Sequence, residues 1–330
     1  MKKNSEEETP EQNNKVMPVL YPWQVKVWDE LNQKINNQRL PHALLLQGAP
    51  DSGLDSFASL FSQYLLCTNK KQSRACGQCR DCLLFIAGSH PGFMEILPLE
   101  SDEGKISKVI KIDQIRDSVD FVMQTSMQNG MKVLLIRPAD TMNPNAANAL
   151  LKNLEEPPRD TQFLLVTNNP GRLMPTIRSR CQVVDIALPA LAEADQWLTP
   201  FIQDGAKRKQ LLELSAGNPL LVKQWQDTAA IADIFALREQ VFEVLAKKNS
   251  PLALAKSWLG HGAERIAWWW RWLLLEAKQG AVSHNTVLDT RRLALFMEKL
   301  LVAKRQLESS ANPNEQLLLE SLLVDWQQLN

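Results

Sequence analysis

The chain has 330 residues, 45% of them hydrophobic and 22% charged, and its 37 basic and 37 acidic side chains give zero net charge. This composition is that of a soluble globular protein with room for two or three domains. With no net positive charge, the composition gives no indication of nucleic-acid binding. No apolar run is long enough for a transmembrane helix, and the polar first residues lack the apolar segment of a secretion signal. We therefore expect a cytoplasmic protein without membrane contacts, whose five cysteines form no disulfide framework.

The first 188 residues follow an alternating pattern. Residues 1–17 are polar, Glu-rich and without aromatic side chains, which predicts a disordered tail. Amphipathic or Ala- and Leu-rich segments then predict helices at Val25 to Ile35, Leu54 to Leu66, Ile112 to Met123 and Asn145 to Glu156. Apolar runs predict strands at Ala43 to Gln47, Phe93 to Leu97, Lys132 to Ile136, Gln162 to Thr167 and Gln182 to Ile186. This alternation predicts an α/β fold with a parallel sheet covered by helices on both faces.

From residue 189 onward the sequence predicts helices only. Residues 189–226 form a small helical unit interrupted at Gly217-Asn218-Pro219, and residues 227–330 form longer helices rich in Leu, Ala and Trp. Tryptophans at 268, 269, 270 and 272 suggest an aromatic platform for single-stranded DNA. However, consecutive positions point around the whole helix, so this pattern favours burial between neighbouring helices.

The stretch from Gly48 to Asp55 has the setting of a phosphate-binding P-loop, because it joins an apolar strand to the start of a helix. A working loop reads G-x-x-x-x-G-K-[ST], in which Lys reaches the phosphates and the hydroxyl holds Mg²⁺. Gly48 and Gly53 keep the spacing, but Leu54 stands at the Lys position and Asp55 at the Ser/Thr position. A negative charge there repels a polyphosphate by some kcal/mol. The pattern predicts the shape of a nucleotide site without its chemistry.

Four cysteines form a cluster with the spacing C-x₈-C-x₂-C-x₂-C. They are Cys67, Cys76, Cys79 and Cys82. Four thiolates complete a tetrahedral Zn²⁺ site, and closed sites of this kind are structural. An iron–sulfur cluster or a redox pair remains an alternative. His90 is close in sequence but has no coordination position left, and the remote Cys181 is expected to be a buried apolar residue.

Other positions bear on nucleotide chemistry. An ATPase of this kind needs acids after its next core strand, but Arg137 and Pro138 stand there, and Asp140 lies beyond the proline. Thr167 ends a strand, where it is either a polar sensor of phosphate or an ordinary strand-end residue. Arg180 lies on a turn before the last strand and is either a solvated surface side chain or a finger that reaches a neighbouring subunit's γ-phosphate.

Several stretches together resemble one family. They are Leu40 to Leu45, the four-cysteine insert, Ser89 to Pro91, Ile112 to Arg116, Ala146 to Pro158 and Ile177 to Cys181. They resemble the clamp-loader branch of AAA+ proteins, and within it the delta-prime subunits of bacterial DNA polymerase III. The resemblance is close over residues 18–226, whereas the last third is similar only in being helical.

The resemblance implies an AAA+ core at residues 18–188 with a zinc module at 67–82, a helical lid at 189–226 and a helical collar at 227–330. It implies that Arg180, in a turn with Ser179 and Cys181, acts as an arginine finger in trans. The implied partners are gamma/tau and delta subunits in a hetero-pentamer, the sliding clamp, and primer–template DNA reached through the assembly. Structural Zn²⁺ is the implied cofactor, and no ATP is bound by this subunit.

Two alternatives remain at this point. The motor subunits, gamma/tau, keep the P-loop Lys, an acid pair and a lid Arg, whereas this chain has Leu220 at the last position. The first alternative is a gamma/tau-like ATPase that still turns over. The degenerate loop instead predicts no catalysis by the isolated chain. The chain would then be only a part of the DNA polymerase (nucleotidyltransferase) holoenzyme. The second is a zinc-stabilised DNA-binding protein. For this alternative, the cysteine loop offers only four basic residues that could contact DNA: Lys70, Lys71, Arg74 and Arg80.

Overall fold

The computed structural model describes residues 18–99, 109–123, 130–279, 290–308 and 313–329. The chain divides into two compact units, residues 1–187 and 188–330, and each is described by itself. The tail expected at residues 1–17 lies outside the described residues.

The first unit is built on a parallel sheet of five strands in the order β2-β3-β4-β1-β5. The strands are β1 (Ala43–Gly48), β2 (Phe93–Ile96), β3 (Lys132–Ile136), β4 (Thr161–Thr167) and β5 (Gln182–Ile186). Every residue of β3 and β4 is buried, as expected for central strands of a sheet covered on both faces. The predicted strands and the parallel sheet are confirmed, with boundaries that differ by no more than a residue.

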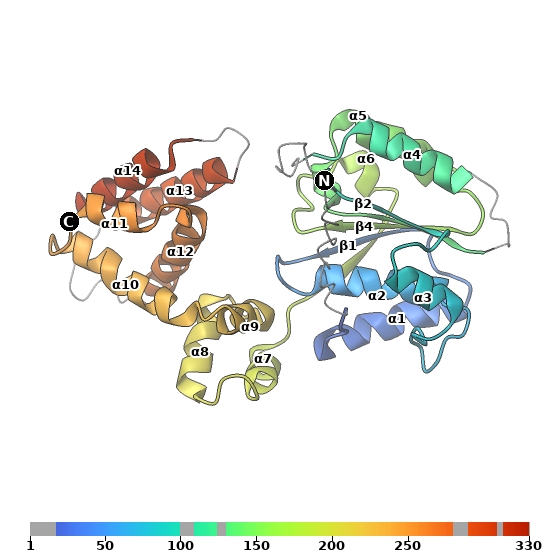
Figure 1. The fold of residues 1–330 in the computed structure, drawn as a ribbon, viewed down its shortest axis with the longest axis horizontal. Coiled ribbons are helices and arrows are strands. Elements are labelled where there is room, and N and C mark those ends of the chain that lie inside the picture. Colours follow the sequence, from blue (N-terminus) through green and yellow to red (C-terminus); the bar gives the residue numbers. More distant parts are fainter. Residues whose placement is uncertain (1–17, 100–108, 124–129, 280–289, 309–312, 330) are drawn as a thin grey trace, which may run out of the picture. The chain divides into compact units, whose positions relative to one another are not determined.

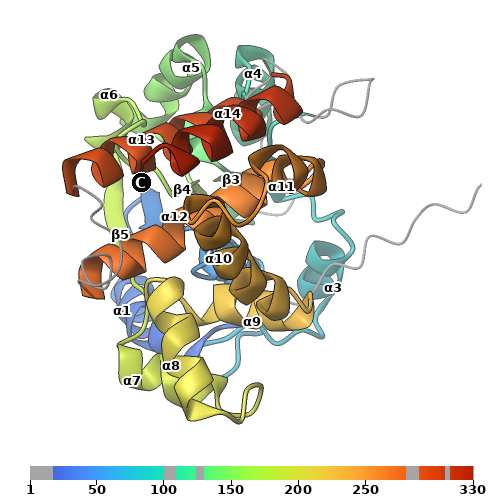
Figure 2. The ribbon, with the colours of Figure 1, turned by 90° about the vertical axis from the view of Figure 1, so that its left-hand side faces the viewer.

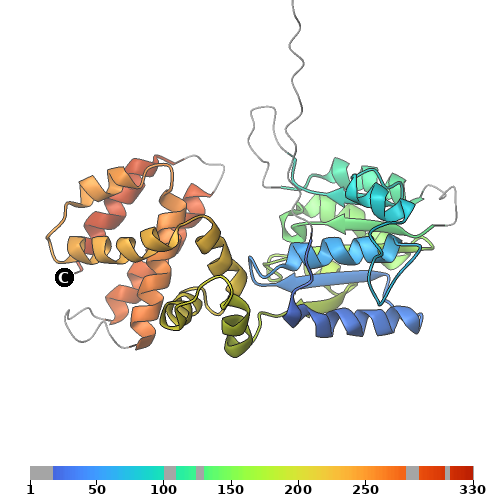
Figure 3. The same ribbon diagram turned by 60° about the horizontal axis from the view of Figure 1, so that its bottom comes forward.

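Helices cover both faces of this sheet (Figures 1 and 3). One face carries α1 (Val25–Asn36) and α2 (Leu54–Leu66), and the other carries α4 (Ile112–Met123), α5 (Pro144–Glu155) and the short α6 (Pro175–Arg178). Neighbouring strand residues point to opposite faces. Accordingly Leu44 packs in the core under α1 and α2, and Leu45 in the core under α4 and α5.

Local sequence explains where α5 begins and ends. The side chain of Asn143 accepts a hydrogen bond from Ala146 N at 2.8 Å, and Pro144 occupies the first helical position, where its missing N–H costs nothing. Pro157 and Pro158 follow the helix and prevent its continuation. The remaining short elements of the first unit are η1 (Pro22–Gln24), α3 (Arg80–Ile86) and η2 (Ala139–Thr141).

In the described residues of the second unit every secondary-structure element is a helix (Figure 2). Its helices are α7 (Leu191–Leu198), α8 (Gly205–Leu214), α9 (Pro219–Asp227), α10 (Ile231–Leu245), α11 (Pro251–Ser257), α12 (Gly262–Gln279), α13 (Thr290–Leu307) and α14 (Glu315–Gln327). Gly217 has a φ of +82° and Asn218 caps α9, so the predicted break is confirmed. One continuous core runs from Ala194 in α7 to Trp326 in α14.

The tryptophans of α12 belong to that core. Trp268, Trp269 and Trp272 are 5%, 0% and 2% exposed. The Trp269 ring meets those of Phe296 and Trp326 at centroid distances of 5.2 and 5.5 Å. Such rings cannot present their faces to bases, which agrees with the packing interpretation of this segment.

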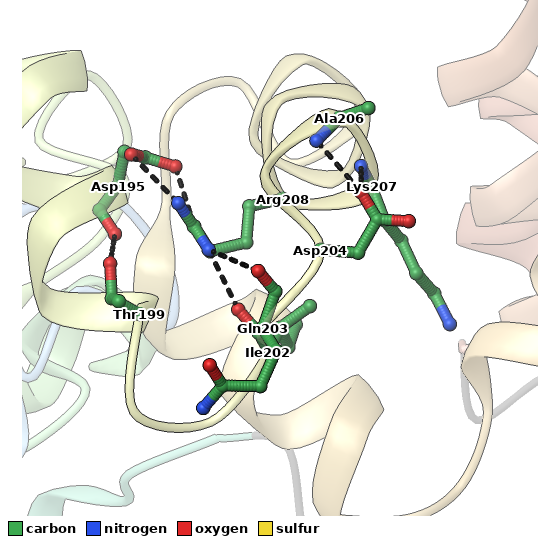
Figure 4. A network of polar contacts seen from close by, with 8 residues as sticks. All are labelled: Asp195, Thr199, Ile202, Gln203, Asp204, Ala206, Lys207 and Arg208. Carbon is green, nitrogen blue, oxygen red and sulfur yellow. Dashed lines mark hydrogen bonds and ion pairs between the residues drawn. The ribbon is translucent and has the colours of Figure 1, made fainter.

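A polar network joins α7 to α8 (Figure 4). Arg208 Nε donates to Asp195 Oδ1 at 2.7 Å, and its Nη1 donates to the Ile202 carbonyl at 2.9 Å. Asp204 caps α8 by accepting from Ala206 N at 2.9 Å. The hydrogen bond from Arg208 lowers the pKa of the Asp195 carboxyl, because it stabilises the charged form.

Candidate functional site

The P-loop-like turn has structural reasons for both of its glycines. A Cβ on Gly48 would lie 2.7 Å from the Ile186 carbonyl oxygen, so the backbone of β5 approaches too closely for a side chain. Gly53 has a φ of +80°, and a Cβ there would lie 2.6 Å from the Tyr21 ring. The two glycines are thus required by packing and backbone conformation, whether or not a phosphate binds.

Side chains of the same unit hold the turn in place. Asn168 Nδ2 donates to the Gly48 and Ala49 carbonyls at 3.0 and 3.1 Å. Gln24, which is 1% exposed, donates from Nε2 to the Ser52 and Gly53 carbonyls at 3.3 and 3.2 Å. These bonds fix the loop from both sides, so its shape does not depend on a bound nucleotide.

The segment before η1 also lies against the start of α2. Ser56 Oγ donates to the Val19 carbonyl at 2.9 Å and accepts from Val19 N at 2.7 Å. The Tyr21 ring stacks on that of Trp23 at a centroid distance of 5.1 Å and packs beside Gly53. A nucleotide at this helix start would have to share the space with the chain's own amino-terminal segment.

The positions that would contact phosphate and metal carry the wrong chemistry. Leu54 is 3% exposed and belongs to the core under α1 and α2, so it does not point at a ligand. Asp55 pairs with Arg137, which follows β3, at 3.3 Å between Oδ1 and Nη1. Arg137 Nε also donates to Glu95 Oε1 of β2 at 2.5 Å. A guanidinium, held by two carboxylates, thus lies where an ATPase would hold Mg²⁺ between its loop and its acids.

Thr167 is fully buried, and its hydroxyl is used within the chain. Its Oγ1 donates to Asp140 Oδ1 at 2.6 Å and accepts from Asn169 N at 2.9 Å. A hydroxyl has one hydrogen to donate. This geometry favours the structural interpretation of Thr167 over the phosphate-sensor interpretation.

The four predicted cysteines come together. Their Sγ atoms all lie within 4.8 Å of one another, with separations of 3.7 Å for Cys67–Cys76, 3.9 Å for Cys67–Cys79 and 4.0 Å for Cys76–Cys82. Four sulfurs about 2.3 Å from a tetrahedral Zn²⁺ lie about 3.8 Å apart. The cluster therefore has the size of a four-sulfur metal site.

Backbone geometry supports this metal-binding arrangement. Gly77 takes a φ of +71°, which lets the chain turn between the second and third cysteines. The N–H groups of Gln78 and Cys79 point at Cys76 Sγ and lower the pKa of that thiol, which favours the thiolate that a metal needs. His90 lies outside the cluster: its Nδ1 accepts from Gly92 N at 3.0 Å.

An aromatic group anchors the cysteine loop to the core. Trp28 is 3% exposed and donates from Nε1 to the Ser73 carbonyl at 2.8 Å. Arg74 lies 5.8 Å from the Trp28 ring centroid, and Lys70 lies 5.3 Å from that of Tyr64. Two of the four basic side chains of the loop are therefore placed over aromatic rings of their own chain.

Arg180 lies at the opposite end of the sheet from the P-loop-like turn. In the parallel β1–β5 pair, Leu44 faces Gln182, and Gly48 faces Ile186. Arg180 precedes Gln182, whereas the turn follows Gly48, and four strand residues span about 13 Å. Arg180 therefore cannot serve the turn of its own chain.

The guanidinium of Arg180 is held on the surface. Its Nε donates to Glu155 Oε1 at 2.8 Å, its Nη2 pairs with the same oxygen, and its Nη1 donates to the Thr176 carbonyl at 2.9 Å. The neighbouring Cys181 is buried, as expected, and burial raises the pKa of its thiol to about 12. At neutral pH this thiol is protonated and unreactive.

Sequence reasoning missed several of these residues. Gln24, Asn168, Glu95 and Glu155 act through partners 25 to 120 positions away in the chain. The composition of the segments around them gave no signal. Only Glu155 lay within a stretch that the family resemblance singled out.

The fold and the site define a class of protein with three features: a parallel-sheet α/β unit whose P-loop-like turn has Leu54 and Asp55 at the Lys and Ser/Thr positions, a four-cysteine cluster, and a helical second unit. The model of the family "DNA polymerase III, delta subunit" matches residues 23–190. The chain is 35% identical to DNA polymerase III subunit delta′ of Pseudomonas aeruginosa, covering 95% of this chain and 99% of that protein. It is 31% identical to the subunit delta′ of Escherichia coli, over 92% and 94% of the two chains.

The chain therefore belongs to the family of DNA polymerase III delta-prime subunits. A solved structure of a DNA polymerase III gamma subunit-related protein from Thermotoga maritima matches 91% of this chain and 98% of its own length, at 18% identity and a TM-score of 0.46. No helix within the described ranges is long and apolar enough to cross a membrane.

Proposed function

We propose that this chain is a subunit of the DNA polymerase III clamp loader that binds no nucleotide itself and helps to load the sliding clamp on primed DNA. One observation carries the proposal: the guanidinium of Arg137, paired with Asp55 and Glu95, stands where an active loop would hold Mg²⁺. The burial of Leu54 supports it, since no side chain replaces the phosphate-binding Lys. The active-ATPase alternative conflicts with both features.

In the proposed assembly, Arg180 is an arginine finger supplied in trans. The position of Arg180, at the far end of β5 from its own P-loop-like turn, supports action on another subunit. A finger stabilises the charge that builds up on the transferred phosphoryl group, and this can be worth about 10³–10⁵ in rate. Ser179 and Cys181 shape the turn: Ser179 Oγ donates to the Thr176 carbonyl at 3.1 Å, and Cys181 packs in the core.

The four cysteines are proposed to hold a structural Zn²⁺. Their sulfur separations support zinc, and a closed four-thiolate site leaves no open position for catalysis. The second alternative, a DNA-binding zinc module, is not favoured, because Lys70 and Arg74 lie over aromatic rings within the chain.

The architecture proposed here is an AAA+ core up to residue 188, a lid at 189–226 and a collar at 227–330 that joins the chain to gamma/tau and delta subunits in a hetero-pentamer. The assembly, located in the cytoplasm, would use ATP bound by the motor subunits to act on the sliding clamp and primer–template DNA. This subunit is the rigid member that completes the neighbouring ATP site.

Equilibrium binding of labelled ATP with Mg²⁺ to the isolated chain tests the nucleotide-free claim. We expect no binding in the micromolar range, with a motor subunit as the positive control. Micromolar affinity would contradict the proposal and restore the active-ATPase alternative.

A further inference from the structure

The hydrogen-bond pattern around Arg180 assigns a role to a residue of another element. Glu155 accepts from Nε at 2.8 Å and pairs with Nη2, so it occupies the side-on edge of the planar guanidinium. Nη1 donates to the Thr176 carbonyl at 2.9 Å and, more weakly, to Ser179 Oγ at 3.4 Å. Arg has five N–H donors, and these contacts occupy four of them, which leaves one N–H of Nη2 for a second anion.

The carboxylate comes from a rigid element. Glu155 is the last residue of α5. The preceding Leu154 is buried at 2% exposure, and its carbonyl accepts a hydrogen bond from His42 Nε2 at 2.9 Å. This hydrogen bond joins the end of α5 to the segment that enters β1, so the backbone that carries Glu155 is held in place.

The location of Glu155 is unfavourable for the helix itself. The carboxyl end of a helix carries a partial negative charge, and a basic side chain is preferred there. Glu155 is also followed by a second acidic residue, Glu156. The acidic side chain of Glu155 therefore does not stabilise the helix end, and it contacts Arg180 instead.

We propose that Glu155 is a positioning residue for Arg180: it holds the Nε–Nη2 edge so that the remaining N–H of Nη2 is presented to the phosphate of a neighbouring subunit. The inference rests on the proposed trans role of Arg180. A free arginine side chain samples many rotamers, and the carboxylate restricts them before assembly. The side chains of Arg180 and Glu155 are 34% and 50% exposed, and exposed pairs of this kind are weak. The pair therefore orients the finger without trapping it.

A double-mutant cycle on the reconstituted clamp loader tests the proposal. Its ATPase is measured with primed DNA and clamp for wild type, Glu155→Ala, Arg180→Ala and the double variant. We expect Glu155→Ala to lower kcat about fivefold at the site served by Arg180. This factor corresponds to the upper end of the free energies that exposed ion pairs contribute. The KM for ATP should change little, since a finger acts on the transition state. In the Arg180→Ala background, Glu155→Ala should have no further effect.

Two further variants separate positioning from folding. Glu155→Gln keeps an acceptor for Nε and should retain more activity than Glu155→Ala, while Glu156→Ala, its exposed neighbour, should behave as wild type. A fall of equal size in both Arg180 backgrounds, or no fall with Glu155→Ala beside a clear loss with Arg180→Ala, would overturn the positioning role alone. No loss with Arg180→Ala would overturn the trans role, and the positioning role with it.

Discussion

Removing the Zn²⁺ proposed for the four-cysteine cluster should loosen one loop and leave the two compact units folded. The perturbation is Cys79→Ser, or chelation after thiol modification. Residues 68–74 are all exposed, so this loop has little core of its own. Its described anchors are few, chief among them the hydrogen bond from Trp28 to the Ser73 carbonyl.

The expected size of the effect follows from comparing the free energy of metal binding with the stability of the sheet. Metal binding in zinc-finger peptides supplies on the order of 10 kcal/mol, as much as the whole stability of a typical domain. Here the parallel sheet has cores of its own on both faces. The loss should therefore appear as local opening of residues 67–86 rather than as global unfolding.

Two measurements check this prediction. Elemental analysis of the purified chain should give one zinc per chain, and hydrogen exchange should show faster amide exchange confined to the cysteine loop and α3 after metal removal. Visible absorption with bound iron would refute the zinc assignment in favour of an iron–sulfur cluster. A loss of the sheet's protection on metal removal would refute the reasoning about separate cores.

Three other predictions concern stability. Gly53→Ala should lower the free energy of unfolding by about 1–2 kcal/mol, because φ is +80° and the new Cβ meets the Tyr21 ring; urea unfolding measures it, and an unchanged midpoint would contradict it. Trp269→Ala should cost about 3–5 kcal/mol, measured in the same way, without weakening DNA binding by the assembly. Arg208 lowers the pKa of Asp195 in the folded protein. Their pair therefore stabilises the fold fully at pH values above about 4, the ordinary Asp pKa, and this stabilisation is lost as the pH falls through the lowered pKa. An NMR titration that finds the Asp195 pKa unchanged in Arg208→Ala would contradict this.

Much of the fold could be predicted from the sequence because its signals are local. Apolar runs and helical periodicity placed the strands and helices, since burial on a sheet or on one helix face imposes those spacings. The cysteine spacing predicted a cluster, because two cysteines with two residues between them on a tight turn can direct their sulfurs at one metal. The glycine spacing predicted the turn, and both glycines prove necessary at their positions.

The contacts that give the candidate sites their chemistry could not be predicted in this way. In the sequence, Arg137 marked only the absence of an acid after β3. The positions of β2, β3 and α2 in the structure showed that it pairs with Asp55 and Glu95. The separation of Arg180 from its own loop followed from the β1–β5 register. Strand order and register depend on contacts between distant segments, which composition and periodicity do not encode.

The central claim is that Arg180 completes an ATP site on a neighbouring subunit. The most direct test is the DNA-stimulated ATPase of a clamp loader reconstituted with wild type, Arg180→Ala, or Arg172→Ala as an exposed control. Arg180→Ala should leave assembly intact while the neighbouring site slows by about 10³, so the total rate falls by that site's share and the control is unaffected. An unchanged ATPase in a fully assembled Arg180→Ala complex would contradict the account.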